Sequence, residues 1–165
     1  MYNKQKYELI YSAFRSGRQE RNLMVARGQR RRNMRYQKMN SSDSQTSYLV
    51  TDGQMKAAEF SYCIVGGQFW LENIQLSNPF LNYERMDAVL QFIQYKCWNM
   101  GFKDMYVKVN GCNLLYMELY KRYGFYIIAE ERREVKKGAY TYEYVLKYPL
   151  PQTREEAYYQ YIRRS

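Results

Sequence analysis

From residue 48 onward, apolar and polar residues alternate in short runs separated by glycine turns. The runs cover residues 48–51, 58–65 and 69–76 and are rich in β-branched and aromatic side chains, which favours strands. Asp52-Gly53 and Gly66-Gly67 separate them, and such pairs are typical of tight hairpin turns. The pattern predicts three consecutive antiparallel strands.

The apolar spacing then changes from that of a strand to that of a helix. Apolar side chains recur three or four residues apart between residues 86 and 100, with Asn82 placed to cap the helix start and Gly101 to end it. A strand follows at 105–109, a second helix between Asn113 and Gly124, and two strands at 125–134 and 140–148. The order β-β-β-α-β-α-β-β predicts an α/β (α+β) domain, with helices flanking a mixed, mostly antiparallel sheet.

The two ends of the chain follow other patterns. We expect an N-terminal basic helical arm at residues 1–39, because four apolar residues share one helical face: Tyr7, Ile10, Tyr11 and Phe14. Residues 40–47 form a polar stretch that is typical of a linker, and the folded body is expected at 48–150. A short helix is expected at 151–165, since Thr153 and Glu156 have the spacing of a capping box.

Positive charge is concentrated in the arm. The chain has 165 residues and carries 26 basic and 16 acidic side chains, a formal net charge of +10. Eleven of the basic and two of the acidic residues lie among the first 40, which gives that stretch +9. The positions expected to bind are Arg27, Arg30, Arg31, Arg32, Arg35 and Lys38. Arginine pairs with phosphate and carboxylate, so residues 15–38 are predicted to contact nucleic acid or an acidic protein partner, with a solubilising role as the remaining alternative.

The residue types exclude several kinds of chemistry. The chain has no histidine, which removes imidazole both as a general base and as a metal ligand. Its three cysteines have no C-x-x-C spacing, so we expect reduced thiols and no metal site. No apolar run is long enough to span a bilayer, and no secretory signal is visible. We therefore expect no membrane partner and a location inside the cell or inside a virus particle, without secretion.

The segment from residue 113 to 125, NLLYMELYKRYGF, resembles the signature N-x-x-A-x-x-L-Y-x-K-x-G-F of the GNAT acetyltransferase superfamily. The residues in register are Asn113, Leu119, Tyr120, Gly124 and Phe125. Tyr116 takes the place of the small residue, and the basic pair is shifted. Upstream, residues 74–76 and Pro79 are similar to the family's fourth strand and the turn after it. The resemblance covers about residues 48–148 and implies a GNAT-like fold.

The resemblance also implies a site for the pyrophosphate of acetyl-CoA. In active members a turn R/Q-x-x-G-x-G/A holds it through backbone N–H groups at a helix start, where glycines allow close approach. The equivalent residues here are Asn82, Tyr83, Glu84, Arg85, Met86 and Asp87. Arg85 and Asp87 occupy the two glycine positions, and the acids should repel an anion. We therefore expect this site to be degenerate and no cofactor to be bound. If the protein is active, the expected cofactor is acetyl-CoA, and Arg85 would then partly replace the lost contacts by binding phosphate directly.

Three further residues have roles in the family pattern. Tyr120 matches a tyrosine that protonates the departing CoA thiolate, although a tyrosine at this helical spacing also fits core packing. Glu72 lies on the expected fourth strand, where some members keep a general base, and it equally fits a solvated surface position. Asn113 matches the first residue of the family signature, so the resemblance places it with residues 82–87 in the degenerate cofactor-binding set. It is also expected to cap the second helix.

These observations lead to competing functions. The first is a GNAT-fold protein without efficient catalysis that acts as a structural or interaction component of a nucleoprotein or phage assembly, since a fold does not fix a function. The alternative is an active N-acetyltransferase that transfers acetyl from acetyl-CoA to an amine. A third is a regulator whose arm binds nucleic acid and whose body forms a homo-oligomer.

Overall fold

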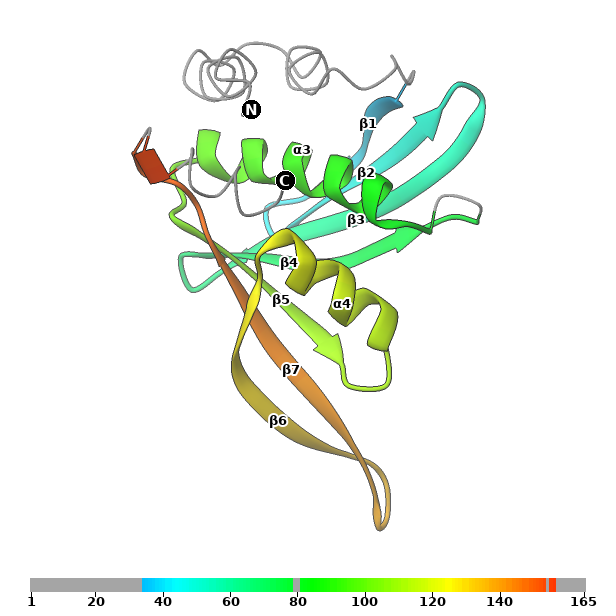
Figure 1. The fold of residues 1–165 in the computed structure, drawn as a ribbon, viewed down its shortest axis with the longest axis vertical. Coiled ribbons are helices and arrows are strands. Elements are labelled where there is room, and N and C mark those ends of the chain that lie inside the picture. Colours follow the sequence, from blue (N-terminus) through cyan, green and yellow to red (C-terminus); the bar gives the residue numbers. More distant parts are fainter. Residues whose placement is uncertain (1–33, 79–80, 154, 157–165) are drawn as a thin grey trace, which may run out of the picture.

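The computed structural model describes residues 34–78, 81–153 and 155–156. Seven strands and two helices lie within these ranges (Figure 1). In chain order they are β1 Met34–Ser41, β2 Gln45–Asp52, β3 Met55–Val65, β4 Gln68–Leu76, α3 Tyr83–Asn99, β5 Asp104–Asn110, α4 Leu114–Tyr123, β6 Tyr126–Lys136 and β7 Ala139–Pro149. From β2 onward, the elements follow the order that the apolar pattern predicts.

All seven strands form one sheet in the order β1-β2-β3-β4-β5-β7-β6. Every neighbouring pair is antiparallel except β4 and β5, which run parallel. The predicted mixed, mostly antiparallel sheet is therefore confirmed. Both helices lie over the same face of the sheet (Figure 1), and the Tyr123 hydroxyl of α4 donates to the Gln94 side chain of α3.

The core lies between this helical layer and the sheet. α3 covers the first strands, where the Tyr36 ring of β1 stacks on Phe92 of α3 with 3.9 Å between ring centroids. α4 packs through Tyr123 against Tyr148 of β7, with ring centroids 5.0 Å apart. Phe92 and Tyr148 are each at most 3% exposed. Burial of one large apolar side chain stabilises the fold by about 1.5–3 kcal/mol, so these contacts fix both helices on one face.

Strand β1 contradicts the predicted arm and linker boundaries. The helical arm was expected to reach residue 39 and the linker to span 40–47, but residues 34–41 pair with β2 along its whole length. The linker residues instead form the end of β1, a tight turn and the start of β2, with the Ser42 N–H donating to the Gln45 carbonyl at 2.8 Å. Met34 is buried beneath the sheet's helical layer, whereas Arg35 is exposed. Such alternation is typical of a strand, and the neighbouring basic residues obscured it.

The ends of α3 agree with the sequence prediction. The Asn82 side chain accepts a hydrogen bond from the Arg85 N–H at 2.9 Å, which caps the first turn. At the other end the chain leaves the helix at Gly101, whose φ of +84° suits glycine. Thr153 and Glu156 also form the predicted capping box, with the Glu156 N–H donating to Thr153 Oγ1 at 3.1 Å. Residues 1–33 of the predicted arm and residues 157–165 of the predicted C-terminal helix lie outside the described residues.

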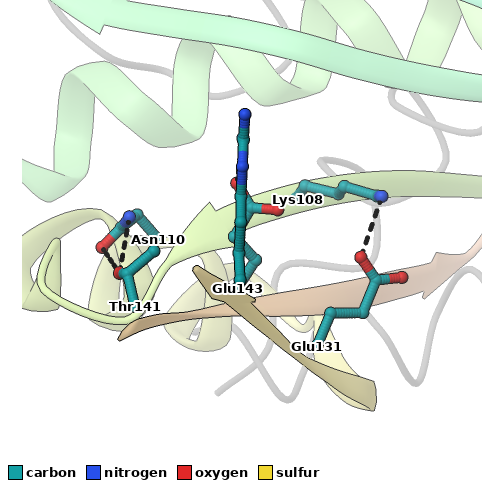
Figure 2. A network of polar contacts seen from close by, with 6 residues as sticks. Lys108, Asn110, Glu131, Thr141 and Glu143 are labelled. Carbon is teal, nitrogen blue, oxygen red and sulfur yellow. Dashed lines mark hydrogen bonds and ion pairs between the residues drawn. The ribbon is translucent and has the colours of Figure 1, made fainter. Parts of the chain in front are cut away.

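The β6–β7 hairpin extends away from the body (Figure 1). Two polar contacts tie it to β5, as Figure 2 shows: Lys108 Nζ lies 3.1 Å from Glu131 Oε2, and Asn110 Nδ2 donates to Thr141 Oγ1 at 3.1 Å. β6 is exposed along its whole length and forms one edge of the sheet. Bulges near Ile128 and Val135 interrupt its register. Charged side chains and bulges protect an edge strand from pairing with another chain.

Candidate active site

Strands β4 and β5 pair only over a short distance and then separate. Their register contains three pairs, which end at Leu71 and Val107. β4 continues to Leu76 and β5 to Asn110, where β5 is paired with β7 on its other side. We call the opening between the two strands beyond Leu71 and Val107 the fork. In an otherwise continuous sheet, backbone donors and acceptors of β4 are directed into this opening.

Glu72 lies where the fork begins. Tyr62 of β3 pairs with Leu71, and Ser61 pairs with Asn73, so Glu72 is the extra residue of a β-bulge. Bulges re-aim a side chain and occur often beside active sites. The Glu72 carboxylate accepts a hydrogen bond from Gln45 Nε2 and lies 3.5 Å from Ser61 Oγ. Glu72 is exposed, and its contact with Ser61 places it on the face away from α3 and α4.

A tyrosine of α4 enters the fork from the other side. The Ser77 N–H donates to the Ala57 carbonyl of the β3 side at 2.9 Å, so the preceding amide, that of Leu76, is directed away from β3. The Leu76 N–H donates to the Tyr116 hydroxyl at 2.9 Å. Tyr116 is half-buried and stands at the small-residue position of the GNAT signature. The replacement is visible in the sequence, but only the structure shows that the phenol contacts the Leu76 amide.

Tyr120 lies one helical turn beyond Tyr116 and is 3% exposed. Its ring packs edge-on against Phe125, with centroids 5.2 Å apart. Burial, and secondarily Tyr116, raise the pKa of the Tyr120 phenol above its usual value. A thiol has a pKa near about 8.5, so proton transfer from this phenol to a thiolate is uphill. Tyr120 is therefore better suited to donating a hydrogen bond than to releasing its proton.

The side chains at the two glycine positions of the family turn are buried. Arg85 is 8% and Asp87 3% exposed, and Arg85 Nη2 lies 2.5 Å from the Asp52 carboxylate at the end of β2. The sequence left open that Arg85 would bind phosphate directly, but in the structure its guanidinium is engaged inside the protein. Asp87 is likewise not displayed on the surface of the turn. Of the first-turn acids, Glu84 is half-buried.

Another cation lies beside this turn. The Arg122 guanidinium of α4 lies 3.9 Å from the ring centroid of Tyr83, the first residue of α3. A cation–π contact of this kind holds the charge near the helix start. Met86, the remaining residue of the turn, is completely buried. The sequence showed Arg122 only as part of a shifted basic pair, because the contact depends on how α4 packs beside α3.

The other predicted residues have simpler positions. Asn113 precedes α4 and is exposed, and its side chain makes no capping hydrogen bond, so that expectation was wrong in its chemistry although its position was right. Arg35 and Lys38 are exposed on β1. The other predicted arm residues, Arg27, Arg30, Arg31 and Arg32, lie outside the described residues.

The structure brings the predicted residues together in two groups. One group comprises the α3 turn with Asn82 as its cap, and the other borders the fork. Glu72 and Tyr120 lie on opposite faces of the sheet. The two faces are connected at the fork, because β4 and β5 are not paired there. Among the residues that the structure describes, no group of three or more His, Cys, Asp or Glu side chains could hold a metal ion. Within the same ranges, neither helix has the length and apolarity needed to cross a membrane.

Comparisons with known proteins bear on the fold. A scan against protein-family models and a search of curated proteins found no match to this sequence. Among solved structures, a GNAT family acetyltransferase from Elizabethkingia anophelis with acetyl-CoA bound has a TM-score of 0.60 at 15% identity, covering 72% of this chain and 99% of that one.

Two further structures are similar. The ribosomal-protein-S18-alanine N-acetyltransferase from Escherichia coli has a TM-score of 0.55 at 16% identity, over 80% of this chain and 78% of that one. Nourseothricin acetyltransferase has a TM-score of 0.57 at 11% identity, over 73% and 86%. At this level of identity the comparison concerns the fold, and a role in a virus particle stays a prediction of the sequence. The chain has the fold of the GNAT acetyltransferases.

Proposed function

We propose that the protein is an N-acetyltransferase that transfers acetyl from acetyl-CoA to an amine. The observation that carries this proposal is Glu72, an exposed carboxylate on a β-bulge where β4 and β5 separate. A strand carboxylate with a purely solvating role needs no bulge and no fork. The GNAT neighbour with acetyl-CoA bound supports the same reaction class through its shared fold.

The residues around the fork offer suitable contacts for acetyl-CoA. The first turn of α3 carries N–H groups that have no acceptor within the helix, together with the positive end of the helix dipole. Arg122 adds a cation next to Tyr83. Asn82 already uses the Arg85 N–H, so fewer backbone donors remain for phosphate than a glycine turn would provide. We therefore expect binding that is weaker than a glycine-rich turn would give, and not its abolition.

The chemistry follows from these positions. Acetyl-CoA supplies a thioester, whose carbonyl carbon forms a bond to the amine nitrogen while the C–S bond breaks and CoA leaves as a thiolate. Glu72 accepts the proton that the amine must lose, directly or through one water. Tyr120 keeps its proton and donates a hydrogen bond that stabilises the negative charge of the leaving group. The solvent supplies the proton that finally neutralises the thiolate.

A second function is favoured by a different observation. Arg85 at a glycine position is held by Asp52, and the Tyr116 hydroxyl closes the fork in the structure as it stands. A protein that no longer binds acetyl-CoA, and serves as an interaction component of a nucleoprotein or phage assembly, would retain both contacts. In that reading the basic stretch 15–38 supplies the contact with nucleic acid or with an acidic partner, and the body supplies contacts with other proteins.

Calorimetry with acetyl-CoA separates the two functions, and an activity assay then tests Glu72. The assay measures CoA release with three amines: a peptide N-terminus, a lysine side chain and a small polyamine. We expect Glu72→Gln to lower kcat by about 100-fold while acetyl-CoA affinity stays unchanged. The matched control is Glu131→Gln, another exposed strand glutamate in a single contact with a lysine. No binding of acetyl-CoA would favour the interaction component, and equal activity of the two variants would remove Glu72 from the mechanism.

A further inference from the structure

Tyr116 is placed to compete with a ligand inside the fork. Its hydroxyl accepts the Leu76 N–H at 2.9 Å across 40 residues of sequence, at the point where β4 has lost its β5 neighbour. A sheet amide at such an opening needs an acceptor, because an unsatisfied buried N–H costs about 1–3 kcal/mol. Leu76 is 9% exposed. The phenol oxygen therefore supplies what a neighbouring strand supplies elsewhere in the sheet.

The direction of the Leu76 amide makes it a ligand contact. Ser77 bonds toward β3, and amides along an antiparallel strand alternate in direction, so the Leu76 N–H faces the fork. By the same alternation, the Ile74 amide has the direction of Leu76. An extended chain entering the fork would run beside these amides. Only a chain with an acceptor oxygen could replace the phenol without leaving the Leu76 N–H unpaired.

We propose that Tyr116 determines which ligands enter the fork: its hydroxyl holds the Leu76 N–H, and a ligand must displace it with a carbonyl oxygen. This inference rests on the proposed acetyltransferase function and adds a specificity-determining residue to it. The eligible ligands carry a thioester or amide carbonyl in an extended chain. The carbonyl could come from the acetyl group or from the amide-containing arm of CoA, and the two sources are distinguishable by experiment.

The burial pattern of α4 supports this role. The residues that hold α4 in place are Met117, Leu119, Tyr120 and Tyr123, each at most 6% exposed. Tyr116 is only half-buried and contributes less to the packing of α4 than these four residues do, so its hydroxyl contact can be lost while the helix stays packed. A change of one rotamer would release the Leu76 amide.

Affinity measurements with the full chain test the proposal. In Tyr116→Phe the ring stays and the hydroxyl is lost, so we expect acetyl-CoA to bind about three- to tenfold more tightly, as the net strength of one hydrogen bond implies. Tyr116→Ala should bind at least as tightly. The matched control is Tyr142→Phe, since Tyr142 is a 46% exposed tyrosine of β7, and its affinity should not change. Adenosine 3′,5′-bisphosphate, which lacks the extended arm, should bind all four proteins equally.

Two additional readouts complete the test. If only acetyl-CoA gains affinity in Tyr116→Phe, the acetyl carbonyl displaces the phenol, whereas an equal gain for free CoA assigns the role to an amide of its arm. By NMR, hydrogen exchange of the Leu76 amide should be at least about tenfold faster in Tyr116→Phe and should slow again when acetyl-CoA is added.

The outcomes that oppose each proposal differ. Binding of acetyl-CoA that is equal in the unmodified chain, Tyr116→Phe and Tyr116→Ala would overturn the role of Tyr116 and leave the acetyltransferase proposal standing. Absence of binding in all of these proteins would sink the proposed function and, with it, this inference. A single cooperative thermal transition in Tyr116→Phe, lowered by no more than the loss of one hydrogen bond implies, would show that its fold is intact.

Discussion

Arg85 stands where the family turn has its first glycine, and its ion pair with Asp52 indicates that its side chain stabilises the fold and does not bind phosphate. Arg85 Nη2 and the Asp52 carboxylate are 2.5 Å apart, and their side chains are 9% and 20% exposed. Removal of one partner of a buried pair costs about 3–5 kcal/mol because the other charge stays buried. Since Asp52 is partly solvated, we expect Arg85→Met to lower the free energy of unfolding by about 2–3 kcal/mol. For a chain of this length that corresponds to a fall in Tm of about 5–10 °C.

A double-mutant cycle isolates the pair from the other contacts of both residues. Asp52→Asn keeps an acceptor oxygen and should cost about 1–2 kcal/mol. The double variant removes both charges of this pair, so it should be about 1–2 kcal/mol more stable than the sum of the single effects implies. Urea unfolding followed by circular dichroism measures all four proteins. Effects that add to within about 0.5 kcal/mol would refute an energetic coupling between these two side chains.

Ligand affinity in the same variants completes this test. Because the guanidinium is engaged with Asp52 inside the protein, Arg85→Met should change the Kd for acetyl-CoA by less than about twofold. A charge-assisted contact to phosphate is worth about 1.5–3 kcal/mol, so its loss would weaken binding by more than about tenfold. A loss of that size with an unchanged fold would show that Arg85 leaves Asp52 to bind the ligand. Arg122→Gln, which removes the exposed cation beside Tyr83, is the comparison in which we expect weaker binding.

Three other outcomes follow from the structure. Gly124 and Gly138 both have positive φ, but a Cβ on Gly124 would lie 3.1 Å from the Tyr148 ring, whereas a Cβ on Gly138 would meet nothing within 4 Å. Thermal unfolding should therefore show Gly124→Ala to be less stable than Gly138→Ala by about 1–2 kcal/mol. Equal losses of stability in the two variants would contradict this packing. Cys112 is exposed, while burial raises the pKa of the Cys97 thiol and keeps it protonated at neutral pH, so a thiol reagent should label Cys112 quickly and Cys97 only after unfolding. Deletion of residues 1–33 should leave β1 and the fold intact and remove any salt-sensitive affinity for nucleic acid; affinity that survives the deletion would exclude this stretch as the binding site.

Strand β1 determines where the chain can be cut to test whether the arm binds nucleic acid. A cut after residue 39, which the sequence boundary suggested, would remove most of β1 together with the buried Met34 and the Tyr36 ring that stacks on Phe92. Loss of nucleic-acid affinity in such a variant could then follow from unfolding. The sequence misplaced this boundary because the residues around Met34 and Tyr36 are basic and polar, as befits an edge strand with one solvated face.

The sequence by itself determined the elements whose causes are local. Glycine turns, apolar periodicity, the Asn82 cap and the capping box at Thr153 depend on residues within one or two turns of each other. The signature around Tyr120 identified the fold because it also lies within one short segment. These features needed no knowledge of distant contacts.

Only the tertiary structure decided what the site residues do. The bulge that presents Glu72 arises from its register with β3, the engagement of Arg85 from the end of β2, and the place of Tyr116 from the separation of β4 and β5. Each of these contacts joins residues more than ten positions apart, and side-chain direction there depends on packing and on unsatisfied backbone groups. An arginine at a glycine position suggested a disabled turn as long as its partner was unknown. Because Asp52 engages the Arg85 guanidinium, whether acetyl-CoA can bind depends less on charge at the start of α3 than on the Tyr116 hydroxyl in the fork.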